Sequence, residues 1–270
     1  MFKHLRNLKK ILLISAFLML LSMLYSFELD QLIQSPTAGI LQRGESSIKF
    51  SMYKNDGMTI GARVGLFPGF MFGVSYGAEG VVGNEKPVWH KRVEFMAKLR
   101  VLDETKAIPA LAVGFSSEGH GVYYDELKRY DIKSKGFYAV ASKNWMFFGN
   151  LGTHFGANFS MENKIDKNMD IFLGIDKTVG KLITVLGEYD FAINDDQNEL
   201  GTLSSNREVN DNIVADPNID LKKIGYLNAS VKFDFNENLA AKLTFYDILQ
   251  KRSDTKFADR TLSIIYTMKF

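Results

Sequence analysis

The chain ends in the stretch Arg260-Thr-Leu-Ser-Ile-Ile-Tyr-Thr-Met-Lys-Phe270, whose side chains alternate in character with a period of two. One face carries Leu262, Ile264, Tyr266, Met268 and Phe270, and the other carries Thr261, Ser263, Thr267 and Lys269. A strand that crosses a bilayer needs this alternation, because one face meets lipid, the other meets a lumen, and every backbone group must be paired within a closed sheet. The stretch therefore predicts the last strand of an outer-membrane β-barrel.

Both ends of the chain carry features of an exported barrel protein. Tyr266, Met268 and the terminal Phe270 resemble the signal read by the barrel-insertion machinery, so we expect that machinery and outer-membrane lipid as partners. At the other end, four basic residues precede an apolar run over 11–25 that is bounded by Ser26. This pattern predicts a cleaved secretory signal peptide over residues 1–26. A membrane-anchor helix is the alternative, but the run is shorter than the roughly 18 to 20 apolar residues that spanning requires.

Period-two alternation recurs in about twelve stretches, each close to the ~9 to 11 residues of a tilted membrane strand. Their apolar faces extend over 48–52, 58–66, 70–76, 93–101, 111–115, 137–141, 151–159, 171–175, 183–191, 227–235, 239–245 and 262–270. The sequence thus predicts an all-β fold, an antiparallel transmembrane barrel of about twelve strands over residues 47–270. A periplasmic or lumenal N-terminal lead is expected over residues 27–46.

The connections between these stretches alternate in length. Short turns lie over 67–69, 103–106, 177–181 and 236–238, whereas long connections lie over 77–90, 116–134, 194–221 and 249–259. This rhythm is typical of short periplasmic turns and longer external loops, and an even strand count would place both termini in the periplasm. A soluble sandwich or lipocalin-like barrel would need bulky inward side chains. The more polar faces instead carry Gly61, Gly65, Gly73, Gly114, Gly156 and Gly174 among charged residues.

Composition excludes several classes of site. Four of the 33 basic residues lie in the predicted signal peptide, so the mature chain has 29 Lys and Arg against 31 Asp and Glu. That balance lacks the clustered basic excess of a nucleic-acid-binding protein. The chain has no cysteine, which excludes disulfides, thiolate metal sites and a lipid-modified N-terminal cysteine. We expect no cofactor, and the histidines His90, His120 and His154 show no zinc spacing.

Charged residues on the inward faces are the main candidate site. Basic ones prevail on the first, second and fourth predicted strands, and acidic ones on the eighth and ninth. The predicted lumen-lining residues are Lys49, Arg63, Arg92, Glu94, Lys98, Arg100, Asp170, Asp176, Glu188, Asp190, Lys232 and Lys242. Opposed walls of charge would set a transverse field that favours small polar solutes. Alternatively, these side chains or the N-terminal lead fill the lumen, which is possible in a barrel of this size.

Part of the chain is similar to a known family. The segments Leu32-Ile-Gln-Ser-Pro-Thr-Ala-Gly-Ile-Leu-Gln-Arg-Gly44 and Val64-Gly-Leu-Phe-Pro-Gly-Phe-Met-Phe-Gly-Val-Ser-Tyr-Gly77 resemble the opening of YjbH-type exopolysaccharide-associated barrel proteins. The segments over 109–115, 135–144 and 188–190 are also similar to parts of that group. The resemblance implies a role in export or assembly of an exopolysaccharide, with periplasmic export proteins as partners.

Three classes of function follow. The resemblance implies polysaccharide export, for which inward aromatic residues near the rim, such as Tyr53, Tyr138 and Tyr246, are candidates. The charge layout predicts a porin-like channel for small solutes. An outer-membrane lipid hydrolase is the third class, because Gly73-Val-Ser-Tyr-Gly77 matches a nucleophile motif and His154 faces inward, but that motif requires a strained strand-to-helix turn. We therefore expect no enzymatic activity.

Overall fold

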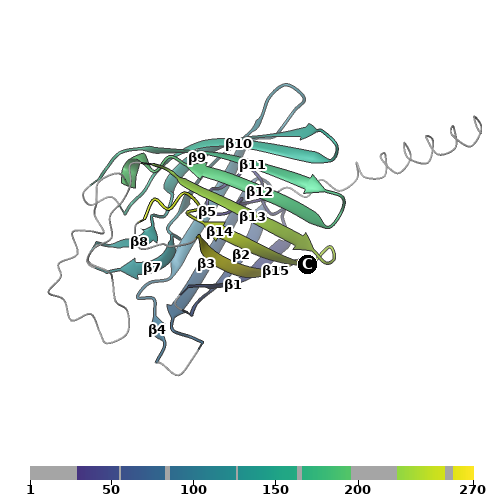
Figure 1. The fold of residues 1–270 in the computed structure, drawn as a ribbon. Coiled ribbons are helices and arrows are strands. Elements are labelled where there is room, and N and C mark those ends of the chain that lie inside the picture. The colour runs from purple at the N-terminus through teal and green to yellow at the C-terminus, as the bar shows by residue number, and fades with distance from the viewer. Residues whose placement is uncertain are drawn as a thin grey trace, which may run out of the picture.

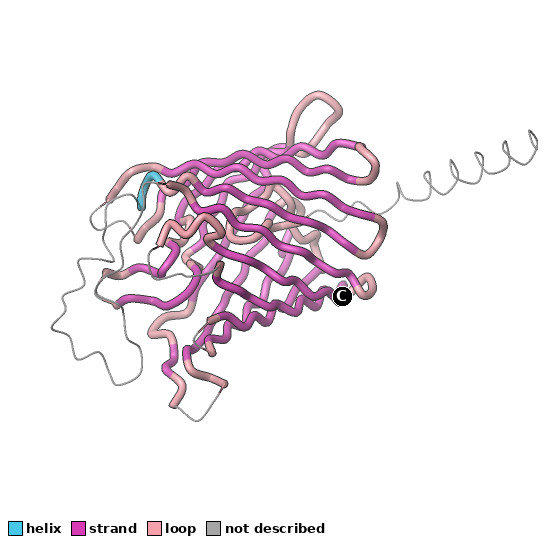
Figure 2. Tube along the Cα trace, in the orientation of Figure 1, coloured by secondary structure: helices cyan, strands magenta, loops and turns pink. Residues whose placement is uncertain are grey.

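The structure is a computed structural model that describes residues 29–54, 56–82, 86–125, 127–162, 166–195, 224–252 and 258–270. Its twelve long strands close into one antiparallel barrel (Figures 1 and 2). They are β1 (Glu45–Tyr53), β2 (Gly57–Phe67), β3 (Phe70–Glu79), β5 (Glu94–Leu102), β6 (Ala110–Ser116), β9 (Gly136–Met146), β10 (Asn150–Phe159), β11 (Asp170–Val179), β12 (Ile183–Asp190), β13 (Tyr226–Asp234), β14 (Leu239–Tyr246) and β15 (Asp259–Lys269). The predicted signal peptide lies outside the described residues.

The barrel closes where its first strand meets its last. Lys49 of β1 pairs with Ile265 of β15 on one side and with Gly61 of β2 on the other. Since β2 also pairs with β3, no barrel strand among the described residues is left as an open edge. Closure gives every strand two partners, which is what backbone groups need where water is absent. The predicted fold class is confirmed.

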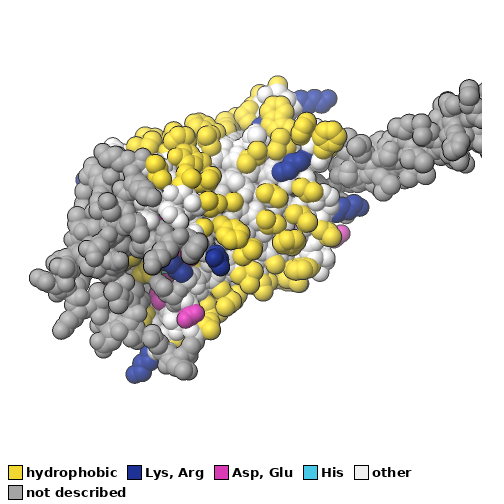
Figure 3. Space-filling view, viewed as in Figure 1, with side chains coloured by type: hydrophobic (Ala, Val, Ile, Leu, Met, Phe, Trp, Pro, Cys, Tyr) yellow, Lys and Arg dark blue, Asp and Glu magenta, His cyan; other side chains and the backbone are white. Residues whose placement is uncertain are grey.

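Side chains alternate between the outside and the lumen as predicted. Ile60, Phe95 and Leu262 are about half exposed, whereas Lys98 and Ser263 are buried in the interior. Apolar side chains cover much of the outer face seen in Figure 3. An apolar outside and a polar inside reverse the arrangement of a soluble barrel, because lipid replaces water as the outer solvent. No helix among the described residues has the length and apolar character that crossing a membrane would take.

The connections differ at the two ends of the barrel. One end, the turn end, has short turns, among them 68–69 and 180–182; the other, the loop end, has the longer connections (Figure 1). Three unpredicted elements lie there: β4 (Val88–Trp89), which extends the sheet beside β3, the hairpin of β7 (His120–Tyr124) and β8 (Arg129–Ile132), and the short 3-10 helix η2 (Ile193–Asp195). They are too short for a periodic pattern to reveal.

Residues 29–43 of the predicted N-terminal lead lie inside the barrel, and from here on the lead means these residues. Leu32, Ser35 and Ala38 of the lead have no exposed surface. Leu32 and Ile33 pack with Leu186 of β12 and Ile132 of the β7–β8 hairpin. Further along the lead, Ala38 packs in a second cluster with side chains of β6, β9 and β11. The lead therefore has its own apolar contacts with both the wall and the hairpin.

Candidate functional site

The basic side of the barrel binds the backbone carbonyls of the lead. Lys98 Nζ of β5 donates to the carbonyl oxygens of Asp30, Thr37 (2.9 Å) and Gly39 (3.0 Å). Arg100 Nε donates to the carbonyl oxygen of Ala38 at 2.9 Å. Hydrogen bonds from a charged donor are among the strong ones, and here they also satisfy backbone groups that are hidden from water.

The acidic side binds the backbone N–H groups of the same segment. The Glu188 carboxylate of β12 accepts from the N–H groups of Ile33 (3.2 Å), Gln34 (3.1 Å) and Ser35 (2.9 Å). Asn228 Nδ2 of β13 donates to Glu188 Oε1 at 2.8 Å. Successive N–H groups form a concave anion site of the kind called a nest, and here the anion is a side chain of the barrel wall. Walls of opposite charge thus hold opposite backbone groups.

Three side chains of neighbouring strands form a third anchor. Ser142 Oγ of β9 accepts from the N–H of Ala38 at 2.8 Å and lies 2.8 Å from Nδ1 of His154. His154 Nε2 lies 2.8 Å from Asp176 Oδ1. Nε2 can donate to the aspartate oxygen, and the serine hydroxyl, while accepting from the lead, can donate to Nδ1. The three side chains together resemble a Ser-His-Asp catalytic triad, but the serine oxygen here accepts a hydrogen bond from the lead.

Side chains of β2 and β14 make further contacts with the lead. Arg63 Nη1 of β2 bonds Asp30 Oδ2 at 2.5 Å, and its Nη2 donates to Gln31 Oε1 at 2.5 Å. Lys242 Nζ of β14 donates to the carbonyl oxygen of Leu32. Lys49 Nζ, in contrast, pairs with Glu118 Oε1 of a loop at 3.4 Å.

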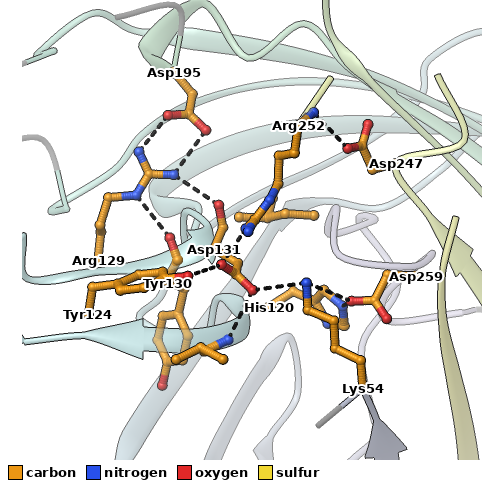
Figure 4. A network of polar contacts seen from close by, with 12 residues as sticks. Lys54, His120, Tyr124, Arg129, Tyr130, Asp131, Asp195, Asp247, Arg252 and Asp259 are labelled. Atoms are coloured by element: carbon orange, nitrogen blue, oxygen red, sulfur yellow. Dashed lines mark hydrogen bonds and ion pairs between the residues drawn. The ribbon is translucent and has the colours of Figure 1, made fainter. Parts of the chain in front are cut away.

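The loop end holds a network of ion pairs around the β7–β8 hairpin (Figure 4). Arg129 makes two bonds to Asp195 of η2, at 2.5 and 3.0 Å. Asp131 pairs with Arg252 and, at 3.5 Å, with Lys54 Nζ. These partners come from the connections after β1, β12 and β14, so the hairpin is tied to three other loops.

The pKa of Asp131 reports on this network. Burial by itself would raise the pKa of the carboxyl group, but the charges of Arg252 and Lys54 and a hydrogen bond from Tyr124 hold the pKa below its ordinary value. Asp195 behaves likewise, because the charge of Arg129 outweighs its burial and lowers the pKa. Both carboxylates are therefore ionised at neutral pH.

A cavity of about 1130 Å³ remains beside the lead. Its lining includes residues of the turn end, such as Asn144, Gly180 and Asn236, and residues of the loop end, such as Tyr53 and His120. Along its length it is lined by the inner faces of β1, β14 and β15. The lumen is thus filled on one side and hollow on the other.

The predicted lumen-lining residues fall into three groups. Lys98, Arg100 and Glu188 contact the lead, as do Arg63 and Lys242, and of these Arg63 and Lys242 also line the cavity. Lys49, Glu94, Asp176 and Lys232 line the cavity as well. Asp170 and Asp190 are buried at the loop end, where Asp190 pairs with Lys135, and Arg92 lies half-exposed just before β5 rather than within that strand. Their role as a site stays a prediction.

The remaining predicted residues lie on the outside or within regular strands. Tyr266 and Phe270 are exposed and Met268 is partly so, and all three belong to β15 or follow it. Ser75 lies within β3, where its Oγ donates to Glu118 Oε2 at 3.0 Å, so the strained turn of a hydrolase is absent there. Within the described part of the chain, no cluster of three His, Asp or Glu side chains could hold a metal ion.

Sequence reasoning missed the residues whose partners are distant in the chain. Ser142 is separated from Ala38 by 104 residues, and Asp30 from Arg63 by 33. A signal for the first existed in the register, because Ser142 of β9 pairs directly with His154 of β10. Nothing local marked Asp30, which lies before the first strand.

A closed antiparallel barrel with an apolar outer surface and a charged lumen defines a transmembrane β-barrel of the outer-membrane type. Among solved structures, the chain is similar to the KdgM porin, with 11% identity and a TM-score of 0.45, covering 82% of this chain and 98% of that one. It is also similar to the NanC porin, with 8% identity, a TM-score of 0.42 and coverage of 83% and 99%. Likenesses this distant carry no argument about function. No family model and no curated protein matches the sequence.

Proposed function

We propose that the protein is a porin-like channel of the outer membrane for small polar solutes, narrowed by its own lead. The observation that carries this proposal is the cavity of about 1130 Å³, whose lining extends from the turn end to the loop end of the barrel. A continuous hollow lined by strand faces is what passage of a solute requires, and the lead reduces the width available to it.

The chemistry of the cavity wall suits polar solutes. Hydroxyl groups of β1 and β15, among them Ser51, Thr261 and Ser263, line it together with Lys49 and Lys242. Acidic residues, such as Asp30 and Glu118, lie on the same cavity, so its charges are mixed. A wall of this kind replaces the hydration of a polar solute and offers nothing to an apolar one.

Passage of a polysaccharide is the second proposal, and the resemblance to YjbH-type proteins is its origin. One observation favours it: Tyr53 and Tyr246, two of the predicted rim aromatics, line the loop end of the cavity. A polymer would, however, share the lumen with a lead that is anchored to both walls. The geometry therefore supports the small-solute channel better.

Single-channel recording in a planar bilayer tests the proposal. Purified, folded protein should give stable conductance steps, and a salt gradient should give a reversal potential that reports ion preference. A folded protein that never conducts would overturn the channel and leave the polysaccharide role, with partner proteins, as the surviving proposal.

Lys49 is the residue with which to test selectivity. Arg63 and Arg100 are less suitable because both hold the lead, whereas Lys49 lines the cavity and pairs with Glu118 of a loop. Lys49→Ser removes a positive charge from the lumen, so the reversal potential should shift toward cations. Lys106→Ser, the same change in the turn between β5 and β6, should leave the reversal potential unchanged.

A further inference from the structure

We propose that the loop end of the cavity is a binding site for a polyhydroxylated ring without negative charge, that is, an uncharged or amino sugar unit. The inference deepens the proposed channel function and rests on it, because a solute must enter the cavity to reach this site. It is carried by the aromatic rings, by one unsatisfied carboxylate oxygen and by the pairing of the bases at this end.

Five aromatic rings line the cavity here in two groups, which are joined by a hydrogen bond between the Tyr53 hydroxyl and His90 Nε2 at 3.3 Å. His120 and Tyr246 are stacked, with centroids 3.6 Å apart and planes 13° apart, and Tyr53 lies 5.9 Å from His120. His90 meets Tyr130 edge-on at 6.1 Å. These rings come from β14, β7, β1, the connection before β5, and β8. Sugar rings have apolar C–H faces that pack on such surfaces, and a stacked pair is a rigid platform.

A carboxylate with an unsatisfied oxygen, itself covered by the protein, lies beside the same space. Glu94 lines the cavity and is only 3% exposed. Its Oε1 accepts from the hydroxyl of Tyr130 at 2.7 Å and from Arg92 Nε at 2.6 Å, but Oε2 has no partner among the described residues. A buried acceptor without a donor costs free energy, so a ligand hydroxyl or ammonium group that reaches it by a small shift of the neighbouring side chains is favoured.

Three described basic side chains beside this end of the cavity pair with carboxylates. Arg92 pairs with Glu94 and Glu162, and Lys49 pairs with Glu118. Lys54 pairs with Asp131 and Asp259. An acidic sugar would thus be repelled by the carboxylates that hold these three bases, whereas a neutral or amino sugar would find acceptors. The charge arrangement selects against anions.

Binding is measured by calorimetry on purified, folded protein with three probes of equal length: a glucose trisaccharide, a glucosamine trisaccharide and a galacturonic acid trisaccharide. The first two should bind saturably and the acidic one should not. Tyr246→Leu, which removes the ring platform and keeps an apolar side chain, should weaken binding of the glucose trisaccharide by about tenfold. Glu94→Gln should weaken the glucosamine trisaccharide more than the glucose one.

Tyr138→Leu is the matched control. Tyr138 is equally buried, but it lies in the apolar cluster around Ala38 and does not line the cavity, so binding should be unchanged. Binding of the acidic probe as tightly as the neutral one, or equal losses in both tyrosine variants, overturns the site. Conductance without sugar binding also overturns the sugar site, but the channel proposal then still stands. Sugar binding without conductance upholds the site and overturns the channel.

Discussion

At the scale of single residues, buried charged side chains of the barrel wall hold the lead in place. Glu188 and Lys98 are each almost fully buried and bind the N–H groups and the carbonyl groups of the lead, respectively. Small residues make the space: a Cβ on Gly174 would lie 2.0 Å from Leu32 Cδ1, and one on Gly65 would lie 2.1 Å from the carbonyl oxygen of Gln42. The inward glycines thus leave room for the lead.

Glu188→Gln should loosen the lead. The neutral amide replaces a charged acceptor of three N–H groups, and one of its two positions becomes a donor, so about 1.5–3 kcal/mol of anchoring should be lost. We expect faster amide hydrogen exchange at residues 33–35 and noisier conductance. Glu237→Gln, on the exposed β13–β14 turn, should leave the exchange at residues 33–35 unchanged. Unchanged exchange in Glu188→Gln would contradict the anchoring role.

Gly174→Ala should displace Leu32, because the added methyl group overlaps the leucine side chain. We expect a cost of about 1–3 kcal/mol that falls on docking of the lead and not on barrel closure. Protease cleavage of the lead in folded, detergent-solubilised protein measures it. Gly187→Ala is the control, since a Cβ there would meet only Ile175 at an ordinary 3.4 Å, and equal cleavage of both variants would exclude the steric explanation.

At the scale of elements, the β7–β8 hairpin joins the loops to the lead. Gln34 Nε2 donates to the carbonyl oxygen of Lys133 at 2.9 Å, just after β8, while Asp131 and Arg129 bind the loops that follow β14 and β12. A hairpin of this size is only marginally stable alone. The position of the hairpin at the loop end therefore depends on these ionic contacts more than on its own strand pairing.

The hairpin should be released by acid. The folded-state pKa of Asp131 is depressed, so its contribution to stability is present above the unfolded value of ~3.9 and is lost as the pH falls from there toward the folded value. Between pH 7 and 5 no release is expected from this group. Asp131→Asn should mimic the protonated form at neutral pH, with accelerated hydrogen exchange over 120–132. Exposed Asp103→Asn should leave that exchange unaltered.

At the scale of the whole molecule, the barrel has two unlike ends. The first and last described residues are Leu29 and Phe270. Phe270 lies at the turn end, and the longer connections gather at the opposite end of the barrel (Figure 1). Exposed aromatic side chains lie near both ends, with Trp89 beside the loop end and Trp145 beside the turn end. Indole groups favour the headgroup region of a bilayer, so the two tryptophans are suited to mark the membrane boundaries.

Orientation can be measured directly because the chain has no cysteine. Single cysteines placed at Asp125, in the β7–β8 hairpin, and at Glu237, in the β13–β14 turn, should react differently with a membrane-impermeant maleimide on intact cells. We expect labelling at position 125 and protection at position 237, since longer loops face outward in bacterial barrels. The reverse pattern would place the termini outside.

The sequence by itself determined the strands, because each strand meets lipid on one face wherever it lies in the barrel. Period-two alternation therefore located all twelve strands, with small differences such as β5 beginning at Glu94 and not at Val93. It also predicted an inward face for Lys98 and Glu188, both of which contact the lead, whereas Arg92 lies just before β5. It could not show that Lys98 and Glu188 hold the same segment, or that His120 and Tyr246 stack, since these residues come from distant parts of the chain. Only closure of the barrel decides which residues meet across the lumen.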